Sequence, residues 1–112
     1  TPCAFTKTSL EQCLNRNGIE QLIVAGTSTN NSVESTVRTA ACRGFRVFLV
    51  GDACFTYSKK DHYGNEFSAE TMHNVSLANI DGEYASVISS KYVLARASSP
   101  NSRKSQNVFK PA

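Results

Sequence analysis

The sequence predicts an α/β fold, a three-layer αβα arrangement in which helices cover both faces of a parallel, Rossmann-like sheet. Two unbroken apolar runs, residues 22–25 and 46–50, are typical of strands that are buried on both faces. Segments with helical periodicity precede, separate and follow these runs. Because the connections are short, this alternation favours parallel strands joined by right-handed crossovers.

Composition and charge limit the kinds of protein that the chain can be. A chain of 112 residues forms one small domain with a limited core. Its net charge of +3 comes from residues 98–112, whereas residues 1–97 are balanced, so we expect a neutral domain with a disordered basic tail. This pattern argues against a nucleic-acid partner. No apolar run reaches the roughly 18 residues of a membrane span, which argues against a membrane partner.

The four cysteines do not form a recognisable metal-binding or redox motif. They include no Cys-x-x-Cys pair, and no histidine stands at a zinc-ligand interval from any of them. We therefore expect no metal site and no cofactor. Because the sequence shows no secretory signal, reduced thiols in a cytoplasmic protein are the simpler interpretation.

The first predicted helix begins in Thr8-Ser9-Leu10-Glu11, which has the form of a capping box with Thr8 as the N-cap. Gly18 is a typical stop signal for this helix. Its buried stripe is predicted to consist of Leu10, Cys13 and Leu14.

The next part of the chain is predicted to form a strand, a turn, a helix and a second strand. Residues 19–25 hold the first strand, Gly26 ends its apolar run, and the small or polar residues 27–31 turn the chain. A helix is predicted over residues 32–43, and residues 46–50 form the second strand.

The remainder begins with residues 51–67, which show no helical or strand period and are predicted to form a long loop, functional or mobile. Ser68 is expected to cap a third helix. Residues 84–89 are predicted to form the third strand, and Ser90 to cap a last short helix. The third helix is predicted to bury one face, made of Ala69, Met72, His73, Leu77 and Ile80.

A strand, a tight turn and a helix meet within residues 22–36. In open parallel sheets such a junction lies at the carboxyl edge of the sheet, where ligands bind. Asp52, after the second strand, is predicted to lie at the same edge, either in a site or as a cap for the turn after Val50.

The same stretch carries the pattern Gly26-x-x-Thr29-x-x-Ser32-Val33. With this pattern, the sequence from Ala4 to Leu94 resembles the C-terminal half of an isochorismatase-like (cysteine hydrolase) domain, which implies a partial domain over residues 1–97. The other matching segments are Ala4-Phe5 with Thr8 and Leu10, Gly18-Ile19, Leu22 to Ala25, Glu34-Ser35-Thr36, Gly44-Phe45, Asp52-Ala53, Ser68 through His73 to Leu77, and Glu83-Tyr84-Ala85.

The resemblance implies a catalytic turn. In the family a cysteine opens the helix after this turn and attacks an amide or a similar carbonyl, so Ser32 stands at the nucleophile position. The backbone amides of Ser28 and Ser32 would form the oxyanion hole, and Thr27, Ser28 and Asn31 would contact a small-molecule substrate. A cis peptide bond is expected between Thr27 and Ser28.

Two departures from the family pattern bear on activity. Ser32 replaces the cysteine, and a serine hydroxyl needs a well-placed base to act as a nucleophile. The aspartate base and the supporting lysine of the family would both fall before residue 1. We therefore expect a hydrolase domain for an amide or related substrate that is inactive as this fragment.

Other interpretations fit the same residues. The chain would alternatively be a non-catalytic subunit that pairs with a second copy or a partner chain through an open sheet edge, or a phosphate-binding half-domain. Ser32 also fits a helix N-cap. His73 fits a packed core position or a catalytic one, and His62 with Asp61 fits a substrate contact or a solvated loop pair.

Overall fold

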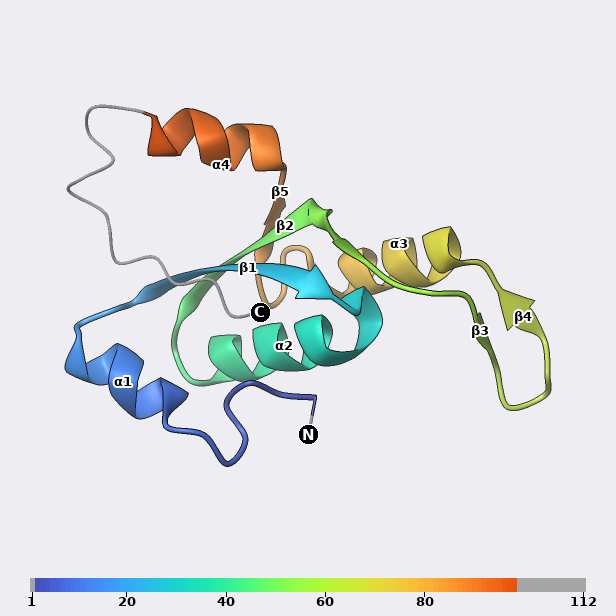
Figure 1. Cartoon of the computed structure of the whole chain (residues 1–112), viewed down its shortest axis with the longest axis horizontal. Coiled ribbons are helices and arrows are strands. Elements are labelled where there is room, and N and C mark those ends of the chain that lie inside the picture. Colours follow the sequence, from blue (N-terminus) through green and yellow to red (C-terminus); the bar gives the residue numbers. More distant parts are fainter. Residues whose placement is uncertain (1, 99–112) are drawn as a thin grey trace.

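The fold is built on a three-stranded parallel sheet. The computed structural model describes residues 2–98. Its main sheet has the order β1-β2-β5, with β1 at Gln21–Thr27, β2 at Arg46–Phe55 and β5 at Ser86–Ile88 (Figure 1). Both pairings are parallel, which confirms the predicted arrangement of three parallel strands in chain order.

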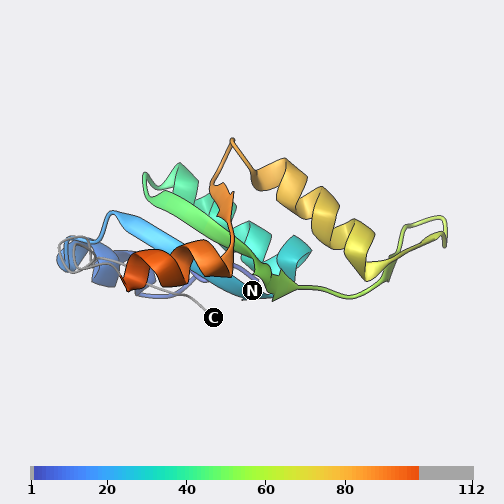
Figure 2. The same cartoon turned by 90° about the horizontal axis from the view of Figure 1, so that it is seen from above.

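Helices lie on both sides of this sheet, as the three-layer prediction requires. The helices α2 (Glu34–Cys42) and α3 (Ala69–Ile80) pack on one face, and α4 (Ser90–Ala97) lies on the other side of the strands (Figures 1 and 2). The core lies between the sheet and the first pair, where the fully buried side chains include Val37, Leu49 and Ile80. In contrast, α4 buries none of its side chains.

The first helix, α1, spans Leu10–Arg16 and corrects two predictions. Its N-cap is Ser9 rather than Thr8, and the Ser9 side chain makes no capping hydrogen bond. The Thr8 hydroxyl donates to the Ala4 carbonyl at 2.6 Å and accepts from the Leu10 N–H at 3.4 Å. Glu11 forms an ion pair with Arg43 at 3.2 Å instead of closing a capping box. Cys13 is exposed rather than buried. In this short helix only Leu14 is buried against the core, and Cys13 points a quarter-turn away from it.

The predicted loop over residues 51–67 is wrong, because β2 continues to Phe55 and a hairpin follows. The hairpin pairs β3 (Lys59–Lys60) with β4 (Glu66–Phe67) and projects from the body of the molecule (Figure 1). Its turn is held by Asp61, whose carboxylate accepts hydrogen bonds from the backbone N–H groups of Tyr63 and Asn65, each at 2.9 Å. This Asx-type closure explains how a polar segment without strand periodicity still forms a hairpin.

Gly51 lies at a close approach between the sheet and α3. A Cβ atom there would stand 3.0 Å from a Val87 methyl carbon and 3.3 Å from one of Leu77. The missing side chain therefore lets α3 pack directly on β2 and β5.

The ends of α3 and α4 test two capping predictions. Ser68 caps α3 as predicted, since its hydroxyl accepts from the Thr71 N–H at 3.1 Å. The cap of α4 is Ser89 rather than Ser90, because Ser90 already has helical geometry and binds Asp52. Apart from Ser98, which ends α4, the predicted tail over residues 98–112 lies outside the described residues. Within residues 2–98, no helix has both the length and the apolar character to cross a membrane.

Candidate functional site

The candidate site is the turn between β1 and α2. Gly26 has a φ of 140°, a conformation that favours glycine, and the β1–β2 register shifts next to it. The Thr27–Ser28 peptide bond is cis, as the resemblance implied. A single π-helical turn, η1 (Thr29–Val33), then leads into α2. This turn stands at the carboxyl ends of β1 and β2, the edge at which parallel sheets bind ligands.

Ser32 lies inside this helical turn rather than at its cap. The helical segment begins at Thr29 with Ser28 as the N-cap, so the predicted helix start at Ser32 is wrong by three residues. The N-cap alternative for Ser32 is excluded for the same reason. Sequence periodicity could not have found the earlier start, because Thr29 to Asn31 are poor helix formers that favour turns.

The Ser32 hydroxyl sits against the cis peptide. Its Oγ donates to the Thr27 carbonyl at 2.8 Å and accepts from the Ser28 N–H at 3.2 Å. Three of the predicted site residues, Thr27, Ser28 and Ser32, therefore meet, and all three are half-buried. Asn31 is exposed beside them. The Ser28 N–H and the Ser32 oxygen therefore lie within hydrogen-bond distance of each other at the turn.

Within the described residues, Ser32 has no partner that could act as a base. Its side-chain hydrogen bonds go only to backbone groups of Thr27 and Ser28. No carboxylate, lysine or imidazole of residues 2–98 hydrogen-bonds to it. A hydroxyl that donates to a carbonyl oxygen is not activated for attack, because that carbonyl cannot take the proton.

His73 contacts the turn but not Ser32. Its Nδ1 lies 2.8 Å from the hydroxyl oxygen of Thr29, which is fully buried. The carbonyl oxygen of Thr29 accepts from the Ser76 hydroxyl at 3.1 Å, and Ser76 is also buried. His73 is therefore a half-buried residue that packs from α3 onto the turn, and it does not reach the predicted nucleophile.

A charged network continues behind the turn, and the sequence reasoning did not single it out. The Ser76 hydroxyl also hydrogen-bonds Glu34, whose other carboxylate oxygen accepts from Arg38 Nε at 2.9 Å. Arg38 then donates to the Tyr84 hydroxyl at 3.0 Å and stacks 4.6 Å from the centre of its ring. The sequence does carry a signal for the Glu34–Arg38 pair, because these residues stand at the i,i+4 spacing of a helical ion pair.

Asp52 does not belong to the turn. Its carboxylate accepts from the Ser90 backbone N–H at 2.7 Å and from the Ser90 hydroxyl at 2.8 Å. These hydrogen bonds, first from the Ser90 side chain and then from its backbone, lower the pKa of Asp52. Asp52 was predicted to lie in a site or to cap the turn after Val50, and it does neither. The strand β2 continues past Asp52, and the carboxylate attaches the start of α4 to β2.

Cys54 is the cysteine placed closest to the turn by the sheet, where it pairs with Gly26 across β1 and β2. It is buried, and burial raises the pKa of its thiol. A thiol of this kind stays protonated and unreactive, so Cys54 does not replace the family cysteine.

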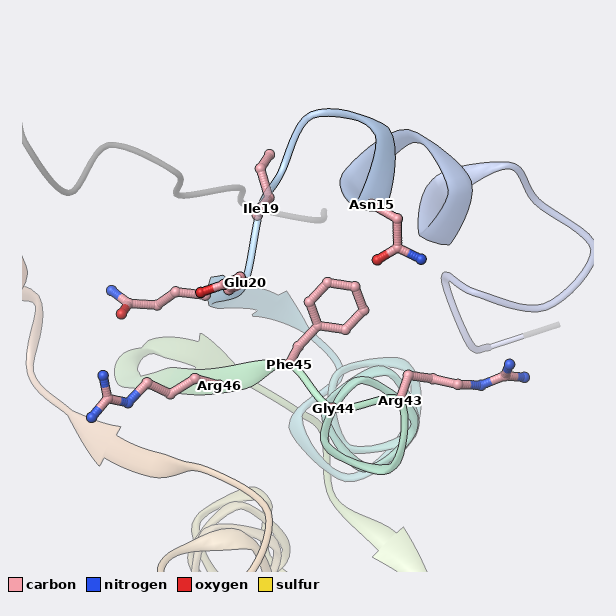
Figure 3. A pocket seen from close by; sticks show the side chains of 8 residues that line it. Asn15, Ile19, Glu20, Arg43, Gly44, Phe45 and Arg46 are labelled. Atoms are coloured by element: carbon pink, nitrogen blue, oxygen red, sulfur yellow. The ribbon is translucent and has the colours of Figure 1, made fainter.

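A surface cavity in the described part of the chain lies away from the turn. A cavity of about 470 Å³ opens at the amino ends of β1 and β2, at the opposite end of the sheet from Ser32. The Phe45 ring points between Ile19 and Asn15, while Arg43 and Arg46 extend to either side (Figure 3). In the part of the chain that the structure describes, no three His, Cys, Asp or Glu side chains gather to hold a metal ion.

The fold and the turn together define an α/β protein of the Rossmann-like class with a strand–turn–helix junction at the carboxyl edge of the sheet. The chain belongs to the isochorismatase family, since residues 1–91 match the model of the isochorismatase domain. It is 30% identical over 91 residues to the isochorismatase family protein YrdC of Bacillus subtilis, covering 81% of this chain and 49% of that protein. It is 42% identical over 62 residues to Nicotinamidase 3 of Arabidopsis thaliana, covering 55% of this chain and 31% of that protein.

Solved structures give the same assignment. An isochorismatase-family protein from Chromobacterium violaceum superposes with a TM-score of 0.82 at 52% identity, over 85% of this chain and 49% of that one. A cysteine hydrolase from Pseudomonas syringae superposes with a TM-score of 0.79 at 28% identity, over 83% of this chain and 44% of that one. The matches thus span about a third to a half of the length of these relatives, and the chain has the family's fold over that part.

Proposed function

We propose that this chain supplies the nucleophile-bearing half of a hydrolase that acts on a small amide or a related substrate, with Ser32 as the attacking residue. The observation that carries the proposal is the meeting of the Ser32 hydroxyl and the Ser28 amide, 3.2 Å apart, at the carboxyl edge of the sheet. The family membership supports hydrolase chemistry, and the similarity to a protein named as a nicotinamidase supports an amide.

The proposed reaction gives a role to each group of the turn. The Ser32 oxygen attacks the substrate carbonyl carbon while a base takes its proton, and the negative charge that develops on the carbonyl oxygen is stabilised by the Ser28 and Ser32 amides. Collapse of this intermediate expels the amine, which takes a proton. Water then hydrolyses the resulting ester and regenerates the serine. Thr27 and Asn31 would contact the substrate beside the turn.

We further propose that the 112-residue chain alone does not turn over amides. Acyl transfer needs a base within hydrogen-bond reach of the nucleophile. The Ser32 hydroxyl instead contacts backbone groups alone within the described residues. Replacing Ser32 by cysteine does not supply that base, so we expect the substitution to leave the isolated chain inactive.

The test is a turnover assay with nicotinamide and a panel of small amides. Five samples are compared: the chain, its Ser32→Cys variant, each of these joined to the N-terminal half of an active relative, and the joined protein carrying Ser32→Ala. We expect turnover only in the joined proteins, faster with cysteine, and none after Ser32→Ala. Robust turnover by the isolated Ser32→Cys variant would show that a base lies within these residues, and the proposal would be wrong.

A second candidate function rests on β1. Among the described residues this strand pairs only with β2, which leaves its other edge open. Its sequence from Gln21 to Thr27 has no charged residue and no proline, so it lacks the usual protection of an edge strand. We therefore propose that this edge pairs with a second copy of the chain or with a partner half. Sedimentation of the chain and of Ile23→Lys tests this, since the charge should shift association toward monomer.

We propose a cytoplasmic location, which the thiols support. None of the four cysteines forms a disulfide, and Cys13 and Cys42 are exposed. Exposed unpaired thiols fit a reducing compartment, which supports a cytoplasmic location.

A further inference from the structure

One residue of the turn, Thr29, is held from both of its polar ends by the same helix. Its hydroxyl oxygen lies 2.8 Å from His73 Nδ1, and its carbonyl oxygen accepts from the Ser76 hydroxyl at 3.1 Å. His73 and Ser76 stand three residues apart on α3 and therefore share one face of it. Thr29 is fully buried and Ser76 is 2% exposed, so water cannot replace these partners without local opening.

The hydrogen bonds of Thr29 attach the turn to α3, which the hydrogen bonds of Ser32 do not do. The Ser32 hydroxyl binds Thr27 and Ser28, which ties the helical turn back to the end of β1. Neither of these hydrogen bonds reaches α3. The side-chain hydrogen bonds between the turn and α3 run instead through Thr29, the first residue after the N-cap Ser28.

Packing alone does not account for a histidine at this position. His73 shares its face of α3 with the apolar Leu77 and Ile80, and a leucine would suit that face equally well. A leucine, however, would leave the buried Thr29 hydroxyl facing an apolar side chain. The imidazole is needed for its ring nitrogen, which in the Nε2-protonated tautomer accepts the Thr29 hydroxyl hydrogen.

We propose that His73 is a positioning residue for the nucleophile turn. Together with Ser76 it binds Thr29 and so holds the helical turn, which keeps the Ser32 oxygen and the Ser28 amide at their observed separation. This rests on the proposed function, in which these two groups are the nucleophile and an oxyanion donor. His73 acts without touching the substrate. Its loss therefore changes the geometry and the dynamics of residues 28–33 rather than any proton transfer.

The experiment measures the turn directly, without turnover. The full chain carrying Ser32→Cys serves as the background, and the alkylation rate of the introduced thiol by iodoacetamide is followed by peptide mass spectrometry. Amide hydrogen exchange is measured over residues 28–33 and over β1 and β2. Three variants are compared on this background: His73→Leu, His73→Asn, whose side-chain amide reaches the Nδ1 position, and His62→Leu. His62 is the matched control because it is an exposed histidine in the hairpin, in ring contact with Tyr63.

We expect His73→Leu to speed exchange over residues 28–33 by about five- to tenfold and to change the alkylation rate of the introduced thiol, while β1 and β2 change less. His73→Asn should restore most of the difference, and His62→Leu should cause none. If His73→Leu does not fold, Thr29→Val, which removes the same hydrogen bond at nearly constant volume, carries the same comparison.

Two results would overturn the inference. One is unchanged exchange and alkylation at the turn after His73→Leu. The other is an equal increase in exchange over the turn and the strands, with no rescue by His73→Asn, since that is the behaviour of a general core residue. Neither readout needs catalysis, so a failure of the joined proteins to turn over amides would count against the proposed function and not against this inference.

Discussion

The buried hydroxyl of Ser76 should contribute measurably to stability, because its single hydrogen lies between two acceptors on different elements. Ser76→Ala removes the hydrogen bonds to the Thr29 carbonyl and to the Glu34 carboxylate. Glu34 keeps its contact with Arg38, but the Thr29 carbonyl belongs to a fully buried residue and loses its side-chain donor. The Thr29 carbonyl keeps the hydrogen bond from the Glu34 backbone N–H. The main loss is therefore the hydrogen bond to the charged Glu34 carboxylate, which is worth about 1.5–3 kcal/mol.

The helix propensity of alanine offsets part of this cost. Alanine is better than serine inside a helix by about 0.5 kcal/mol, so the free energy of unfolding should fall by a net ~1–2.5 kcal/mol. For a domain of this size each kcal/mol corresponds to about 4–8 °C in Tm. Urea unfolding followed by circular dichroism, with thermal melts, measures both quantities.

The matched control is Asn74→Ala, an exposed position on the same helix. It gains a similar helix propensity and loses no buried contact, so its Tm should stay the same or rise slightly. Equal Tm values for Ser76→Ala and Asn74→Ala would refute the reasoning. They would mean that the contacts of the Ser76 hydroxyl with Thr29 and Glu34 add nothing to stability in solution.

Three further predictions concern other parts of the fold. Asp52→Asn should loosen α4, seen as faster amide exchange in residues 90–97, because it weakens the two hydrogen bonds from Ser90. The pKa of Asp52 is lowered from 3.8. The contribution of the Asp52 carboxylate to stability is therefore present above that pH and is lost as the pH falls below it. Asp52→Asn should accordingly lose less stability than the unchanged chain below about pH 4. Leu49→Ala, at a fully buried position of β2, should lower the free energy of unfolding by about 2–5 kcal/mol in urea titrations, whereas Leu94→Ala, 66% exposed on α4, should change it little. If β1 is the pairing edge, Ile23→Lys should reduce self-association in sedimentation experiments. Unchanged association would mean that the interface does not involve β1.

The main architecture could be predicted from the sequence because its signals are strong and local. The runs Leu22 to Ala25 and Arg46 to Val50 gave the two long strands, and Ser68 gave the start of α3. The extension of β2 to Phe55 could not be predicted in this way. It depends on pairing with Gly26 and Thr27 after a register shift, a tertiary contact that leaves no period in the sequence.

The candidate site divides in the same way. The pattern from Gly26 to Val33 located the turn, and the cis bond between Thr27 and Ser28 is where the family resemblance placed it. The hydrogen bonds of His73 and Ser76 with Thr29 could not be predicted, because both residues are more than 40 positions away from Thr29 in the chain. A polar residue on the buried face of α3 was the available signal, and only the packing of α3 on the turn decides its partner.

The central claim is that residue 32 is the attacking group of an acyl-transfer site which this chain carries but does not complete. Mass spectrometry of a trapped acyl-enzyme tests it most directly. The Ser32→Cys chain, alone and joined to the N-terminal half of an active relative, is incubated with a small amide, quenched in acid and digested. The account predicts an acyl adduct on residue 32 in the joined protein and none in the isolated chain. An adduct on Cys54 or another native cysteine, or one on residue 32 of the isolated chain, would contradict it.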